Sequence, residues 1–183
     1  VLGLLPVQVF AADAALAEVF IALDAAAAKT EQYEITDKEI KLLKEDVVYE
    51  LSGTTDKPIY MWGSNGSDPV KTFYLRLNDM QTNGGFSVYN PDGAKLVVEV
   101  VEGTENTVQK LYAVNLTITG AGTLHASSLG VTQSTDERNT VGLYIKDTEV
   151  EVTTSRDNQW NGDCVLDGEA KVTYITDSDY APL

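Results

Sequence analysis

The sequence is poor in the side chains that most enzyme mechanisms need. Its 183 residues include one cysteine and one histidine. A single cysteine, Cys164, excludes an internal disulfide and a thiolate metal cluster, and we expect it to behave as a small buried hydrophobic residue. Any Ser-His-Asp or Cys-His mechanism would have to use His125. The residues beside His125 in the sequence offer no partner for a general base, so its neighbourhood does not point to catalysis.

Basic residues are also scarce. There are 13 Lys and Arg against 28 Asp and Glu, which gives a formal net charge of −15 and an isoelectric point near 4.2. This charge repels polyphosphates and anionic lipids, so it excludes nucleic acid as an expected partner. It is compatible with divalent cations or with a neutral polymer such as a polysaccharide, and it also keeps an exported protein soluble. Hydrophobic residues make up 43% of the chain, enough for one domain with a packed core.

The first residues have the features of a processed leader. Residues 1–11 form an apolar run that ends in Val-Phe-Ala, which resembles the C-terminal part of a secretory signal peptide. Acidic residues at 13, 18 and 24 interrupt any run long enough to span a bilayer. We therefore expect a secreted or cell-surface protein that is not inserted in the membrane after signal cleavage. Residues 12–32 are rich in alanine and predict a helix over Ala12–Lys29, or a linker.

From residue 33 to 183 the helical period gives way to short β runs between Gly, Asn and Asp clusters. We expect strands at 47–53, 58–63, 72–78, 86–90, 95–101, 116–120, 142–147, 148–154 and 170–176. Similar runs recur every 20 to 30 residues or so, which is typical of a solenoid. The absence of helical segments between them argues against a doubly wound α/β sheet.

Side-chain parity favours the same fold. Phe73, Leu75 and Leu77 share one face of their run, as do the apolar residues of 95–101, and we expect these faces to stack inward. An outward column would then contain Glu50, Arg76, Glu99, Thr117 and Glu151. An antiparallel β-sandwich is the alternative, since short strands with frequent turns fit it too, and residues 116–127 could form a hairpin around Gly120-Ala121-Gly122.

Five motifs in a fixed order carry a family resemblance. They are Leu51-Ser52-Gly53-Thr54, FYLRLND (73–79), GGFSVYNPDG (84–93), LVVEVVEGTENTV (96–108) and LTITGAGTLHAS (116–127), followed by GLYIKDTEVEV (142–152). Over residues 40 to 176 the chain resembles an exported bacterial carbohydrate-binding domain family. The resemblance implies an all-β fold, a right-handed parallel β-helix with the shape of the pectate lyases. The chain ends in DSDYAPL without a recognisable cap, so we expect a truncated domain or further chain.

Two candidate sites follow. On strand parity Tyr60, Trp62 and Tyr74 could form an exposed aromatic platform for sugar rings, with Trp160 as a further candidate. The loop SRDNQWNGD (155–163) holds oxygen ligands suited to a hard cation, and we expect Asp157 and Asp163 to be the ligands of a calcium ion there.

The sequence and the resemblance together predict a noncatalytic polysaccharide-binding module, assisted by calcium. Its ligand would be a plant cell-wall glycan or another acidic or neutral glycan. Two other functions stay open. One is a polysaccharide lyase or glycosidase on the same scaffold, and the other is a structural or adhesin module of a cell-surface protein.

Overall fold

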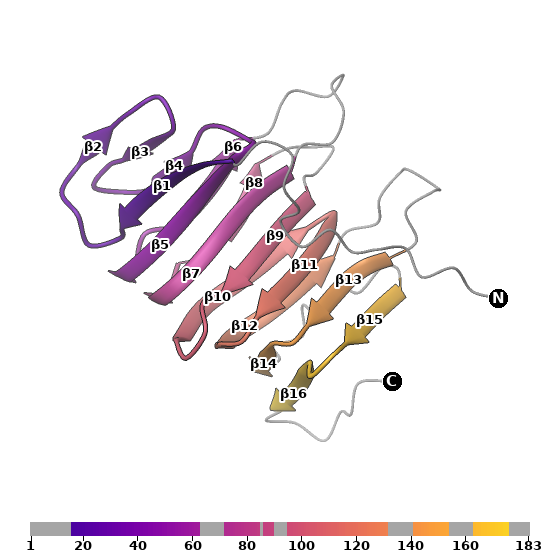
Figure 1. Cartoon of the computed structure of the whole chain (residues 1–183). Helices are drawn as coiled ribbons and strands as arrows, with labels where there is room; N and C mark the ends of the chain where they lie inside the picture. Colours follow the sequence, from indigo (N-terminus) through magenta and orange to yellow (C-terminus); the bar gives the residue numbers. More distant parts are fainter. Residues whose placement is uncertain are drawn as a thin grey trace.

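The protein is an all-β solenoid, seen in a computed structural model (Figure 1). The structure describes residues 16–62, 72–84, 86–89, 95–131, 141–153 and 163–175, without the side chains of 62, 86–89, 141 and 163. The signal peptide predicted at residues 1–11 therefore lies outside the described residues. Within them, no segment forms a helix that could cross a bilayer.

Apart from two short strands within residues 28–35, the described strands stack in parallel and form three walls, here called A, B and C. Wall A contains β1 (Ala17–Ala22), the first part of β5 (Val47–Thr55) and of β7 (Thr72–Thr82), β9 (Lys95–Val100), β11 (Asn115–Gly120), β13 (Val141–Lys146) and β15 (Asp163–Asp167). Wall B contains the ends of β5 and β7, the first parts of β10 (Glu105–Ala113) and β12 (Thr123–Val131), then β14 (Glu149–Thr153) and β16 (Lys171–Ile175). Wall C contains β4 (Ile40–Leu42), β6 (Ile59–Trp62), β8 (Phe86–Tyr89) and the ends of β10 and β12.

This pairing confirms the predicted parallel β-helix and excludes the sandwich. The antiparallel pairs among the described strands are confined to β2 (Ala28–Lys29), β3 (Tyr33–Ile35) and β4. The hairpin considered for residues 116–127 does not form, because β11 pairs with β9 and β13 whereas β12 pairs with β10 and β14.

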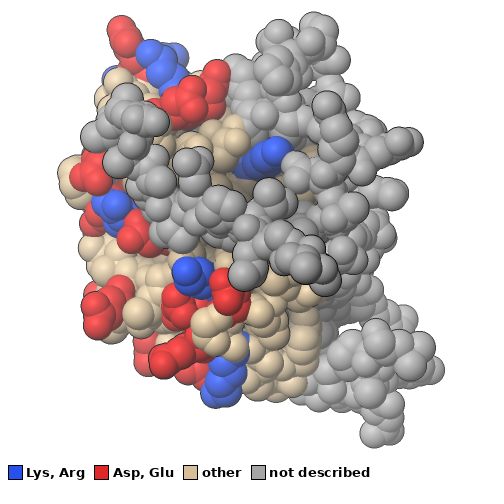
Figure 2. Space-filling view, turned by 45° about the vertical axis from the view of Figure 1, so that its right-hand side comes forward, with Lys and Arg blue, Asp and Glu red and all other residues tan. Residues whose placement is uncertain are grey.

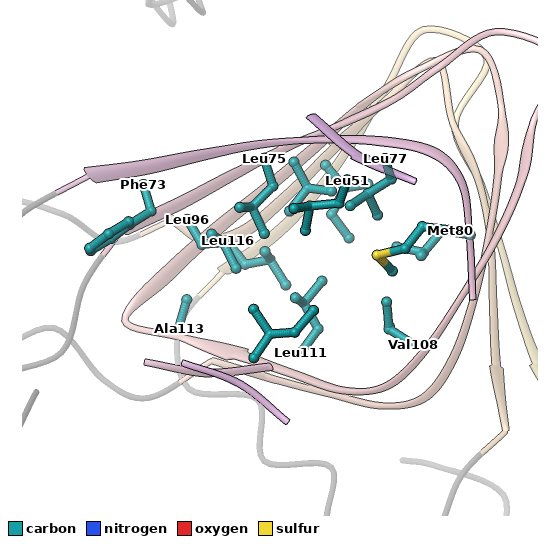
Figure 3. Close-up of a cluster of buried hydrophobic side chains, with 14 of the residues drawn as sticks. Leu51, Phe73, Leu75, Leu77, Met80, Leu96, Val108, Leu111, Ala113 and Leu116 are labelled. Atoms are coloured by element: carbon teal, nitrogen blue, oxygen red, sulfur yellow. The ribbon is translucent and has the colours of Figure 1, made fainter. Parts of the chain in front are cut away.

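The interior is filled by aligned rows of apolar side chains, as predicted from parity. Tyr49, Leu75, Val98, Ile118 and Ile145 occupy one register row of wall A, and each is 0% exposed. Figure 3 shows this interior, with Leu75 and Leu77 from wall A facing Leu111 and Ala113 from wall C. Each added coil thus extends the same dry core by one strand spacing of about 4.8 Å.

The corner between walls A and B depends on residues in the left-handed conformation. From β5 onward, each described coil has one residue with positive φ at this corner: Gly53, Asp79, Gly103, Gly120, Asp147 and Gly168. Glycine adopts this conformation without strain, and aspartate tolerates it better than most residues. These residues end the alternating run of wall A and redirect the chain into wall B.

The predicted N-terminal helix is wrong in its described part. Residues 17–22 instead form β1, which pairs in parallel with β5. Val19, Ile21 and Leu23 also alternate, and Ile21 and Leu23 are buried at 2% and 1% exposure. Burial on the first rung of the core outweighs the helical propensity of the surrounding alanines.

The N-terminal end of the core is covered by residues 28–46, which carry β2, β3 and β4. The buried Tyr49 hydroxyl fixes this segment: it lies 2.8 Å from the Gln32 carbonyl and 2.9 Å from the Lys44 carbonyl, and it accepts the Lys44 N–H at 3.1 Å. Burial raises the pKa of Tyr49, because the ionised form would be desolvated.

Candidate functional site

The structure does not bring the predicted aromatic residues onto one wall. Tyr60 lies on β6 in wall C, in register with Lys41 and Ser87. Tyr74 lies on β7 in wall A, in register with Val48 and Val97. The platform was predicted from the order of strands in the sequence, but consecutive strands belong to different walls, so Tyr60 and Tyr74 point from different sides of the solenoid.

The other predicted site residues are only partly placed. Trp62 pairs with Tyr89 through the backbones of β6 and β8. Asp163 begins β15, whereas Asp157 and Trp160 lie outside the described residues. In the part of the chain that the structure describes, no three His, Cys, Asp or Glu side chains cluster in a way that could hold a metal ion. The calcium site stays a prediction.

Wall C nevertheless carries an aromatic row that the sequence did not reveal. The pairing of Leu111 with Phe86 places Tyr112 in register with Ser87, which is itself paired with Tyr60. Tyr60 and Tyr112 are both partly exposed. They stand two strand spacings apart along the solenoid, about 10 Å.

The Tyr112 ring packs against the next coil. A Cβ added to Gly130 would come within 2.0 Å of Cδ1 and Cε1 of Tyr112, so the ring occupies the space over this glycine. The Tyr112 hydroxyl is 3.2 Å from Oγ of the buried Ser128. An aromatic ring over a glycine on the neighbouring strand stabilises the sheet, and the Tyr112 residue stays partly exposed.

Charged groups border this aromatic row. Lys41 is in register with Tyr60 and forms an ion pair with Glu39 at 2.6 Å. The hydrogen bond to Glu39 raises the pKa of Lys41 above its usual value. Lys110 is exposed near Tyr112 on β10. The arrangement offers flat apolar surfaces with hydrogen-bond donors beside them, which are the features that bind sugar rings.

Wall A carries the predicted charge column in its first part. Arg76 Nε donates to Glu99 at 2.8 Å, and Nη1 lies 2.9 Å from Glu18 and 3.6 Å from Glu50. The hydrogen bond to Glu99 raises the pKa of Arg76. The prediction is wrong for the later members of the column. On β11, Thr119 and not Thr117 is in register with Glu99.

The last member of that column, Glu151, lies on wall B. There it contacts His125, with Nδ1 of the histidine 2.9 Å from Oε2 of the carboxylate. Sequence analysis missed this partner because it comes from the next coil, not from residues near His125. The pair gives the imidazole the kind of carboxylate contact that orients a general base. On the other side, His125 is in register with Thr107.

Charges of both signs are mixed on the visible surface. Figure 2 shows the described Lys and Arg residues among Asp and Glu, without a large basic area. This agrees with the excess of acidic over basic residues in the sequence.

Comparisons of the chain with protein-family models, with curated proteins and with solved structures found no match.

Proposed function

We propose that the chain is an exported module that binds polysaccharide without catalysis, through the outer surface of wall C. The observation that carries the proposal is the row of Tyr60 and Tyr112, two partly exposed rings at aligned register positions about 10 Å apart. Export is supported by the leader-like residues 1–11.

The physical basis is stacking on a rigid surface. The apolar faces of sugar rings pack on aromatic side chains, and their hydroxyl groups bond to polar groups alongside. The parallel wall holds Tyr60 and Tyr112 at a fixed spacing, so little conformational entropy is lost when a polymer binds. The acidic character of the whole chain favours a neutral glycan, or an acidic one bridged by calcium.

The experiment is retention on insoluble cellulose, xylan and pectin. Tyr60→Ala and Tyr112→Ala should each weaken binding by about tenfold, equal to 1.4 kcal/mol. Tyr74→Ala removes an aromatic side chain from wall A and serves as the matched control, so it should leave binding unchanged. Circular dichroism spectra verify that each variant keeps its β structure.

Two results would contradict the proposal. If all three variants are retained as well as the wild type, wall C is not the site. If the wild type binds none of the glycans, a structural or adhesin module is left as the function. Release of unsaturated or reducing sugars during incubation would instead identify a lyase or glycosidase.

Calcium assistance is tested separately. Binding is compared in excess calcium and in chelator, with Asp157→Asn and Asp163→Asn beside the wild type. We expect the chelator and both substitutions to weaken binding. Binding that is the same in calcium and in chelator would remove the metal from the proposal and leave the aromatic row in place.

A further inference from the structure

One ring of the aromatic row on wall C is held in place by the neighbouring strand. β12 runs beside β10 (Figure 1), and Gly130 of β12 is in register with Tyr112 of β10. The three atoms nearest to a Cβ built on Gly130 all belong to Tyr112: Cδ1 and Cε1 at 2.0 Å and Cγ at 3.1 Å. The ring therefore occupies the place that a side chain at position 130 would take.

A second contact holds the far end of the same ring. The Tyr112 hydroxyl lies 3.2 Å from Oγ of Ser128, which is 1% exposed. Leu129 and Val131 belong to the core, so Ser128 and Gly130 face outward by strand parity. Both are nevertheless buried. An outward position that is buried needs a cover, and the Tyr112 side chain contacts both of these positions.

The backbone at position 130 does not itself require a glycine. Gly130 is not among the residues with positive φ, so an alanine could adopt its conformation. Glycine inside a strand weakens the strand unless another group approaches closely at that point. Here the group that approaches is the Tyr112 ring. The absence of a side chain at position 130 thus serves the placement of this ring.

Tyr60, the other ring of the row, is not placed in this way. Its register neighbours are Lys41 and Ser87, so neither adjacent strand offers a glycine beneath it. A ring that is ordered before the ligand arrives loses less conformational entropy on binding. Binding sites are also more precise when packing fixes the side chains that touch the ligand. Both effects apply to Tyr112.

We propose that Gly130 is a positioning residue for glycan binding: it leaves room for the Tyr112 ring and so fixes the ring in the orientation that stacks on a sugar. The inference rests on the proposed function, since it gives Gly130 a part in the binding at wall C. Ser128 supports the ring from its other end. A side chain at position 130 therefore acts on glycan binding through Tyr112 alone.

The first test is retention of Gly130→Ala on the glycans that the wild type binds. The atoms that the new methyl group would meet belong to a side chain that can rotate away, so the variant should fold. Retention should weaken by about three- to tenfold, because the displaced ring must be ordered again when the ligand binds. Adding Gly130→Ala to Tyr112→Ala should cause no further loss, since no ring is then left to displace.

The second test follows the ring without any ligand. Gly130→Ala should lower the urea midpoint of unfolding in the wild type, where it displaces the ring. It should raise the midpoint in Tyr112→Ala, where alanine only replaces a flexible glycine in a strand. Gly103→Ala is the matched control, because it strains the corner between walls A and B and contacts no atom of wall C. It should lower the midpoint and leave retention on glycans unchanged.

The possible results separate this inference from the proposed function. If Tyr112→Ala weakens retention and Gly130→Ala does not, the inference is wrong and the function stands. The inference also fails if the double variant binds more weakly than Tyr112→Ala, or if Gly103→Ala weakens retention as much as Gly130→Ala does. A wild type that binds no glycan, or that is unaffected by Tyr112→Ala, would remove the proposed function and the inference with it.

Discussion

At the residue scale, the corner between walls A and B places strict demands on the residues that form it. Gly120 has a φ of +112°, and a Cβ placed there would lie 2.1 Å from the Val100 carbonyl oxygen. Backbone atoms cannot move away as a flexible side chain can. Gly103 has a φ of +73° at the same kind of corner but has no atom within 4 Å of its Cβ position. Comparing substitutions at these two glycines therefore separates the effect of conformational strain from that of steric overlap.

Substitution by alanine should expose this difference. Gly103→Ala adds only the strain of a left-handed residue and should lower the free energy of unfolding by about 1–2 kcal/mol. Gly120→Ala adds backbone overlap and should cost at least about 3 kcal/mol, or prevent folding. Urea unfolding followed by circular dichroism measures both. Similar losses for the two variants would show that the corner relaxes, and that overlap with Val100 is not important.

A second feature at this scale is the bond between Tyr144 and Asp167 on wall A. The Tyr144 hydroxyl donates to Oδ2 of Asp167 at 2.6 Å. Desolvation and this carboxylate raise the pKa of Tyr144 to about 12, and the bond lowers the pKa of Asp167. Since the folded-state pKa of Asp167 is depressed, its stabilising effect is present above the pKa of the unfolded chain and is lost as the pH falls through the folded value.

At the scale of elements, the covering segment at residues 28–46 depends on one buried hydroxyl. Tyr49 is 0% exposed, and its hydroxyl forms hydrogen bonds with the backbone of Gln32 and Lys44. Tyr49→Phe keeps the ring in the core but removes the hydroxyl, so these backbone groups lose their hydrogen-bond partner. We expect a loss of about 1–3 kcal/mol in the free energy of unfolding, because buried polar groups would remain unsatisfied.

Hydrogen exchange localises the effect of Tyr49→Phe. The amides of Leu43 and Lys44 should exchange faster, since Leu43 N–H donates to the Gln32 carbonyl at 2.8 Å in the same segment. Amides of β14 should be unchanged, because they lie several coils away and a solenoid couples mainly nearest neighbours. Tyr144→Phe removes a hydroxyl that bonds to Asp167 in a distant coil, and as the control it should leave the exchange of Leu43 and Lys44 unchanged. A uniform loss of protection along the chain would show that the segment is not an independent unit.

The same scale shows how far sequence analysis could go. Runs with clear alternation, such as β7 and β9, were predicted because the buried side chains themselves carry the signal. β10 was missed, since ENTVQKLYA bends from wall B to wall C and its alternation shifts on the way. β1 was missed because its alanines favour a helix when taken alone, and only pairing with β5 makes it a strand.

The candidate site was harder to predict than the fold. Tyr60 and Trp62 were recognised on their strand, but Tyr112 joins Tyr60 only through the register of β8 and β10. Coils differ in length, so the sequence does not specify which residues of successive coils face each other. For the same reason Glu151 was assigned to the Arg76 column, although it pairs with His125 on wall B.

At the scale of the whole molecule, net charge and local ion pairs act in opposite directions. The chain carries a formal charge of −15, and compact folding brings these charges together. Local pairs such as Arg76 with Glu99 and Glu18 offset part of this repulsion. Salt weakens both effects, so its influence on stability shows which one is larger.

We expect repulsion to dominate. Exposed ion pairs contribute about 0–1 kcal/mol each, whereas the 28 acidic residues outnumber the 13 basic ones and repel over distances comparable to the screening length of about 10 Å at 0.1 M salt. The urea midpoint of unfolding should therefore rise when sodium chloride is increased from low to moderate concentration. Arg76→Met provides the internal comparison: it leaves Glu18, Glu50 and Glu99 close together, so it should be less stable in low salt and gain more from added salt than the wild type. A midpoint that falls with salt in the wild type would mean that the ion pairs outweigh the repulsion, and that the acidic surface is already balanced by the arrangement of its few basic residues.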